Sequence, residues 1–192
     1  MKKTLVLFIL PFILSACCLK PAERWSEEKA NAWWAEQEWP VGCNYVPSYA
    51  VNQLEWWQEE TFDIDLIDHE ISLAESLGFN TLRIYFIEHL WWADKEGYKS
   101  RIEQFFRCAD SHGMKLIVTM FTNGGSILEP ELGPQPQPVD GMHSSAWIPN
   151  PGPKVLSDRS LWPKYEKYIK EIFRTYGKDS RILYWCLYNE PE

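Results

Sequence analysis

The chain has 192 residues, of which 45% are hydrophobic and 15% aromatic, so it is not a disordered chain and can bury a sizeable core. Its formal net charge of −8 gives no electrostatic reason to expect binding to nucleic acid or to an anionic membrane surface.

Residues 1–16 have the features of an export signal. Two lysines precede an apolar run over residues 5–14, which is too short to cross a bilayer as a helix. The residues Leu-Ser-Ala-Cys at 14–17 are similar to the lipobox of bacterial lipoproteins, which implies cleavage before Cys17 and a lipid on that residue. We therefore expect an exported protein, lipid-anchored to the cell envelope, that contacts the membrane only through this anchor. An ordinary signal-peptidase cut near Ala16 is the alternative.

Residues 17–39 are predicted to form an anchor segment and a leading helix. Ser26 followed by two glutamates is typical of a helix start, because the hydroxyl caps free backbone N–H groups and the acidic side chains favour the helix N-terminus. We expect this helix to pack beneath the following domain, with Trp33 and Trp34 as core residues more than as ligand contacts.

From residue 40 to residue 192, predicted strands and helices alternate. Apolar runs predict strands over 40–47, 79–86, 114–121 and 181–188, and helical apolar stripes over 61–77, 98–112 and 161–176 are each followed by a glycine. Such alternation predicts an α/β domain with a parallel sheet and crossover helices.

Three segments that follow the predicted strands are expected to be loops. The first contains Trp56 and Trp57, and the second runs from Glu88 to Trp92, where ligand contacts are plausible. The third, over 122–160, is rich in proline and glycine, and a loop of this length inside a domain is usually functional. It would lie at the C-terminal side of the third strand, and we expect its His143 and Trp147 to line a substrate groove.

Arg83 is a charge within the second apolar strand. A guanidinium is costly to bury unless it is paired, so we expect a carboxylate partner at the mouth of the sheet. A purely structural salt bridge is the alternative.

The fourth predicted strand leads directly into Asn189-Glu190-Pro191, with no polar spacer. This places a carboxylate at a strand's C-terminal tip, where parallel barrels carry their catalytic groups. Asn-Glu-Pro in this position resembles the acid/base motif of the retaining glycoside hydrolases with (β/α)8 barrels, particularly family 5. The resemblance implies that residues 40–192 form the N-terminal half of a (β/α)8 TIM barrel, strands one to four.

The same resemblance implies hydrolysis of O-glycosidic bonds in β-linked glycans of the glucan, mannan or xylan type. Glu190 would be the acid/base, Asn189 would bind the sugar 2-hydroxyl, and Arg83 would lie beside the nucleophile. In the family that nucleophile is a glutamate on strand seven, and neither Glu88 nor Glu192 matches its position. We therefore expect a truncated piece of a longer enzyme, inactive alone.

A non-catalytic glycan-binding lipoprotein or pseudoenzyme is the alternative. Eleven tryptophans suit either function, because indole rings stack on the apolar faces of sugars, although most should belong to the core.

No cofactor or metal is predicted. Cys43, Cys108 and Cys186 are expected to be buried free thiols. His, Cys and carboxylate residues show no metal-ligand spacing, and no glycine-rich phosphate loop or nucleotide motif follows a strand. Water is the only co-reactant implied.

Overall fold

The computed structural model describes residues 23–191. The chain divides into two units, and the boundary in the sequence falls between residues 38 and 39. The first unit contains helix α1 (Glu27–Ala35), which Ser26 caps as predicted by accepting a hydrogen bond from the Lys29 N–H over 3.3 Å. No residue of α1 is buried, and the two units are described separately, so the core role expected for Trp33 and Trp34 stays a prediction. Packing of this helix beneath the barrel stays a prediction.

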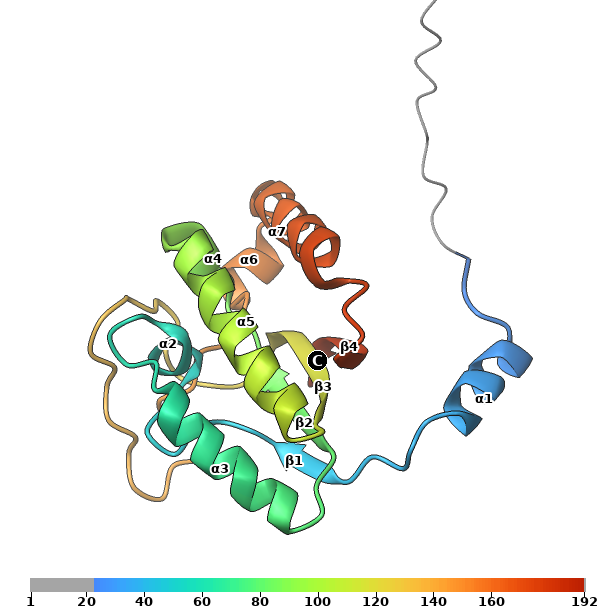
Figure 1. Ribbon diagram of the computed structural model, residues 1–192. Helices are drawn as coiled ribbons and strands as arrows, with labels where there is room; N and C mark the ends of the chain where they lie inside the picture. Colours follow the sequence, from blue (N-terminus) through green and yellow to red (C-terminus); the bar gives the residue numbers. More distant parts are fainter. Residues whose placement is uncertain (1–22, 192) are drawn as a thin grey trace, which may run out of the picture. The chain divides into compact units, whose positions relative to one another are not determined.

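The second unit is built on a sheet of four parallel strands in the order β1-β2-β3-β4 (Figure 1). The strands are β1 (Gly42–Asn44), β2 (Thr81–Tyr85), β3 (Lys115–Thr122) and β4 (Ile182–Asn189). All four were predicted, although β1 is shorter than expected. The α/β class is confirmed, and the arrangement is that of the first half of a (β/α)8 barrel.

Helices connect the strands in the predicted order. The crossover helices are α3 (Ile64–Ser76), α5 (Lys95–Ser111) and α7 (Trp162–Tyr176), and the shorter elements are α2 (Gln53–Trp57), α4 (Glu88–Ala93), α6 (Pro153–Ser157) and the 3-10 turn η1 (Arg159–Leu161). Aspartate side chains cap two of the long helices: Asp63 accepts a hydrogen bond from the Leu66 N–H, and Asp94 accepts one from the Gly97 N–H.

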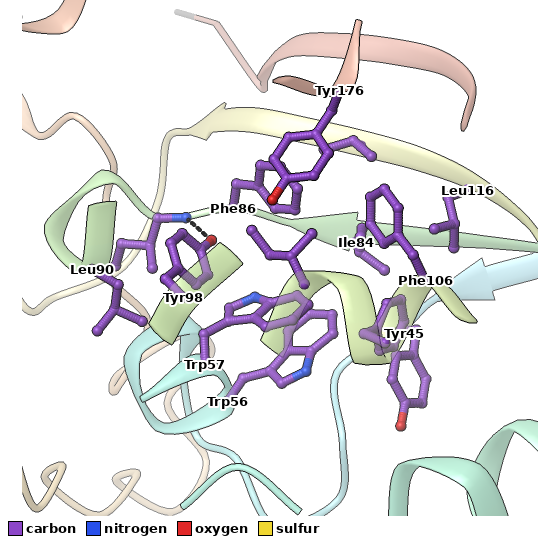
Figure 2. Packing of buried hydrophobic residues seen from close by; sticks show 14 of the residues in the cluster. Tyr45, Trp56, Trp57, Ile84, Phe86, Leu90, Tyr98, Phe106, Leu116 and Tyr176 are labelled. Atoms are coloured by element: carbon purple, nitrogen blue, oxygen red, sulfur yellow. Dashed lines mark hydrogen bonds between the residues drawn. The ribbon is translucent and has the colours of Figure 1, made fainter. Parts of the chain in front are cut away.

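The hydrophobic core lies between the sheet and the crossover helices, and its centre is aromatic (Figure 2). Trp56 and Trp57 stack with ring centroids 4.4 Å apart, and both are fully buried. The Trp57 indole N–H donates to the carbonyl of Tyr85 over 2.9 Å, which ties the core to the end of β2. The loop expected here is therefore helix α2, and its tryptophans are core residues.

The segment after β2 is also helical rather than a loop. Helix α4 fully buries the side chain of Glu88 and leaves Trp91 only 3% exposed. Glu88 is therefore not available to a ligand at the surface, whereas Trp91 borders a cavity of about 350 Å³. Ligand contacts at Trp91 stay a prediction.

The loop predicted over 122–160 is irregular as far as residue 152, but its last part forms α6 and η1. Side-chain amides fix the course of the irregular part beside α2. Asn52 donates from its Nδ2 to the side chain of Gln135 and to the carbonyl of Ala146, and Gln53 donates to the carbonyl of Ile148. From the segment itself, Asn150 donates to the carbonyls of Phe86 and Met120. Because these amides are buried, they hold the segment in one position over the strand ends.

Cys43, Cys108 and Cys186 are free thiols as expected, but only Cys108 is buried. Within residues 23–191, no helix is both long and apolar enough to cross a membrane. Cys17 and the export signal lie outside the described residues.

Candidate functional site

The last residue of each strand lines the same cavity. Asn44, Tyr85, Thr122 and Asn189 end β1, β2, β3 and β4, and all four border a cavity of about 480 Å³. This convergence follows from the topology, because parallel strands bring their carboxyl ends to one edge of the sheet.

The remaining walls come from the segments after the strands. Val46 follows β1, Glu190 follows β4, and the long segment after β3 contributes Asn123, Gly124, Gly125, His143, Ser144 and Trp147. The structure therefore brings together four residues that were chosen from the sequence, namely Glu190, Asn189, His143 and Trp147. Four other cavities have volumes of about 350 to 470 Å³, so the lining and not the size distinguishes this one from them.

Asn189 is held in place from two sides. Its Oδ1 accepts a hydrogen bond from Arg83 Nη2 over 3.0 Å, and its Nδ2 donates to Thr122 Oγ1 over 3.2 Å. A side-chain amide has two N–H donors, and only one is used here. The second can donate to a ligand hydroxyl in the cavity.

Arg83 lies beneath the cavity and does not line it. Its guanidinium donates to five neutral acceptors: Asn44 Oδ1, Tyr85 Oη, Thr119 Oγ1, Cys186 Sγ and Asn189 Oδ1. It forms no salt bridge with any residue in the described part of the chain, so the expected carboxylate partner is not found there. Arg83 instead links residues of all four strands and fixes three of the four strand tips.

Tyr85 presents its hydroxyl group at this site. Burial raises the pKa of the Tyr85 hydroxyl, so the group stays protonated. Its oxygen accepts from Arg83 over 3.3 Å, which leaves the O–H free to donate.

Glu190 has an unusual backbone conformation. Its φ of 53° lies in the left-handed region, which costs a non-glycine residue about 1–2 kcal/mol. Ser144 is the other non-glycine residue with positive φ between 23 and 191, and it lines the same cavity. Strained backbone of this kind clusters at functional sites. The Glu190 side chain is exposed, and it is the one carboxylate lining this cavity among the described residues.

Gly125 allows the long segment to close around Trp147. A methyl group on Gly125 would lie 2.3 Å from the Trp147 carbonyl oxygen, whereas one on Gly124 would make only an ordinary contact with Glu190 Oε2, at 3.9 Å. The Trp147 carbonyl accepts hydrogen bonds from the N–H groups of Ser126 and Ile127. The Trp147 ring packs edge-on against Tyr85, with centroids 5.5 Å apart and an interplanar angle of 88°.

The cavity therefore combines an exposed carboxylate, a fixed amide, a phenolic hydroxyl and an indole ring. Such a set suits a neutral ligand with many hydroxyl groups, which offers both hydrogen-bonding groups and apolar ring faces. Sequence reasoning missed Asn44, Tyr85 and Thr122. Thr122 directly follows the predicted strand 114–121, so the rule that indicated Asn189 would have indicated it. Asn44 and Tyr85 lie inside the predicted strands 40–47 and 79–86, which extend past the real strand ends, so that rule could not indicate them.

Comparison with known proteins supports the fold. No protein-family profile matches this sequence, and no curated protein matches it. Among solved structures, the chain is similar to the exo-beta-1,4-mannosidase Op5Man5 from Opitutaceae bacterium strain TAV5, with a TM-score of 0.54 and 22% sequence identity. The match covers 79% of this chain and 24% of the mannosidase, so the chain spans about a quarter of that enzyme's length. At this level of identity the likeness shows a shared fold.

Proposed function

We propose that this chain supplies the acid/base half of a retaining glycoside hydrolase that acts on β-linked glycans. The observation that carries the proposal is the convergence of Glu190, Asn189 and Trp147 with the tips of all four strands at one cavity. The fold is shared with a β-mannosidase, a protein that acts on this class of bond.

In the proposed mechanism, Glu190 protonates the departing glycosidic oxygen and later removes a proton from the incoming water. The free N–H of Asn189 donates to the 2-hydroxyl of the sugar under attack, while Trp147 stacks on a sugar ring. A second carboxylate, about 5 Å from the first, must attack the anomeric carbon. That group is not found among the described residues lining the cavity, so we propose that it lies on strands beyond β4.

The open inner face of the sheet supports the proposal that further strands carry the nucleophile. On this face a cavity of about 470 Å³ is lined by Gly42, Arg83, Ile117 and Tyr184. In a closed barrel, side chains from the remaining strands fill such a space. Tyr184 on this face is 44% exposed, and Leu187, on the opposite face of the same strand, is 62% exposed, so parts of both faces of β4 have no covering partner within the described residues.

The proposed protein is exported and held to the cell envelope by a lipid on Cys17. Incorporation of labelled palmitate that disappears in Cys17→Ala would support the anchor, and unchanged incorporation would remove it.

The catalytic role of Glu190 is tested on the protein produced from the native locus, with any in-frame continuation. Glu190→Gln should abolish hydrolysis of unactivated β-linked oligosaccharides, because their leaving groups need a proton. The variant should retain part of its activity on aryl β-glycosides, because their leaving groups depart without protonation. It should also still bind glycan. Equal hydrolysis of unactivated substrates by the variant and the parent would contradict the assignment.

A second candidate is glycan binding without hydrolysis. It is favoured by the presence of a single carboxylate at the cavity among residues 23–191. If the protein from the native locus binds β-linked oligosaccharides but hydrolyses none of them, this function replaces the first.

A further inference from the structure

A group of potential metal ligands lies on the helical side of the molecule. Asp68 belongs to α3, Cys108 belongs to α5, and His112 follows the last turn of α5. One ligand atom from each residue lies within 4.8 Å of the other two. Because α5 ends just before β3 begins, the group is at the edge of the sheet opposite the strand tips.

Two of the three distances between ligand atoms are close to the ligand spacing of a tetrahedral zinc site. His112 Nε2 lies 3.1 Å from Asp68 Oδ1, and Cys108 Sγ lies 3.5 Å from the same oxygen. With metal bonds of about 2.0 to 2.3 Å, tetrahedral ligand atoms are about 3.2 to 3.7 Å apart. The third pair, Cys108 Sγ and His112 Nε2, lies within 4.8 Å, so a metal ion between the three atoms would draw these two side chains together while Asp68 stays in place.

A fourth residue orients the histidine. Glu75 Oε2 lies 2.6 Å from His112 Nδ1, the ring nitrogen that faces away from Asp68. A histidine that binds metal through one ring nitrogen usually donates a hydrogen bond from the other ring N–H to a carboxylate. This hydrogen bond fixes the tautomer and orients the first nitrogen toward the ion. Here Glu75 fixes Nδ1 and leaves Nε2 for the ion.

We propose that Asp68, Cys108 and His112 bind a zinc ion that joins α3 to α5. A thiolate and an imidazole favour zinc over magnesium or calcium. On binding, the Cys108 thiol loses its proton to solvent and its sulfur forms a bond to the metal. The Asp68 side chain is 59% exposed, so the fourth coordination position is open to water.

Sequence spacing did not indicate this site, because its ligands come from two helices. Cys108 and His112 are four residues apart on α5, which places them on one face of the helix, but Asp68 joins them only when α3 packs alongside.

Cobalt(II) is the probe, because a bond to thiolate produces a charge-transfer band in the near ultraviolet. The purified chain should develop this band, and zinc should abolish it by displacing cobalt. Cys108→Ser should show no band, whereas Cys43→Ser, which removes an exposed thiol, should keep it. Absence of the band in the parent, or its persistence in Cys108→Ser, would overturn the proposal.

Two further measurements do not depend on replacing a buried residue. Zinc should raise the Tm of the parent chain, and Asp68→Asn and His112→Gln should lose that rise. Glu75→Gln should lower the zinc affinity by about tenfold to a hundredfold, because it removes only the orienting partner. A zinc-dependent Tm that is identical in Asp68→Asn and the parent would also overturn the site.

Discussion

At the scale of single residues, Gly125 determines the shape of the candidate site. Gly125 has a φ of +108°, and its position leaves no room for a methyl group beside the Trp147 carbonyl. The position of the Trp147 ring, and therefore any stacking on a sugar, depends on this close approach.

Gly125→Ala should therefore destabilise the fold by about 2–4 kcal/mol, because it adds a steric clash to the cost of positive φ. Gly133→Ala is a matched control, since Gly133 has a φ of +100° and nothing within 4 Å of an added methyl group. The control should lose only about 1–2 kcal/mol. Urea denaturation measures both values, and equal losses would show that the contact with Trp147 has no energetic role.

The sequence predicted part of the site because certain residues stand at strand ends. Asn189 and Glu190 follow directly from that position, and His143 and Trp147 from the length of the segment that carries them. The partners of Arg83 could not be predicted, because they depend on the register of four strands. That register places neutral acceptors from β1, β3 and β4 around the guanidinium where a carboxylate was expected.

Among the structural elements, the long crossover helices were predictable and the short helices were not. Helices α3, α5 and α7 are long enough to show an apolar stripe. Helices α2 and α4 have five and six residues, too few for a period to be seen. Their paired tryptophans were therefore interpreted as loop residues, although Trp56, Trp57 and Trp91 are buried.

Helix α4 contains two neighbouring titratable residues, Glu88, which is fully buried, and His89, whose side chain is 29% exposed. Burial raises the pKa of Glu88 from 4.5 to about 7, and burial lowers the pKa of His89 from 6.5 to about 4. Their nearest polar atoms, Glu88 Oε1 and His89 Nδ1, are 3.4 Å apart. Both side chains are therefore uncharged in the folded protein near pH 6.

The two residues have opposite effects on stability as pH changes. Above pH 4.5, unfolded Glu88 ionises while folded Glu88 keeps its proton up to about pH 7, so its contribution falls as pH rises. Below pH 6.5, His89 is protonated in the unfolded chain, whereas in the folded chain it stays neutral down to about pH 4. Its contribution to the free energy of unfolding therefore rises with pH. Between pH 4.5 and 6.5 the two slopes largely cancel.

Glu88→Gln should reveal the histidine slope, so its stability should rise with pH between 4.5 and 6.5. At pH 8 the variant should be more stable than the parent by about 3 kcal/mol, because the cost of ionising a buried carboxyl is removed. Urea denaturation across this range measures the effect, with the exposed Glu129→Gln as a control. A variant whose pH profile matches that of the parent would contradict the account.

For the whole molecule, the sheet is covered on one face only. The helices bury the outer face of β2 and β3, whereas Leu187 on the outer face of β4 is exposed and the described side chains of the inner face remain accessible along β1 and β4. Strand β4 is an edge strand of eight residues with exposed apolar side chains. Its unpaired backbone N–H and C=O groups can pair with another chain.

The purified chain should therefore self-associate, and Leu187→Lys should shift it toward the monomer, because a charge on an edge strand opposes pairing. Leu77→Lys is the matched control, since Leu77 is 74% exposed at the end of α3 and away from β4. Sedimentation velocity gives the size distribution. A monodisperse parent monomer, or an equal shift in the control, would show that the β4 edge does not drive association.

The central claim, that the strand-tip cavity is a glycan site, is tested most directly by titration with β-linked oligosaccharides of the glucan, mannan and xylan types. Titration with one of these ligands should change the tryptophan fluorescence of the parent chain, and the change should reach saturation. Trp147→Ala should lose that response, while Trp162→Ala, which removes an exposed indole outside the cavity, should retain it. No saturable response in the parent, or an unchanged affinity in Trp147→Ala measured by calorimetry, would contradict the account.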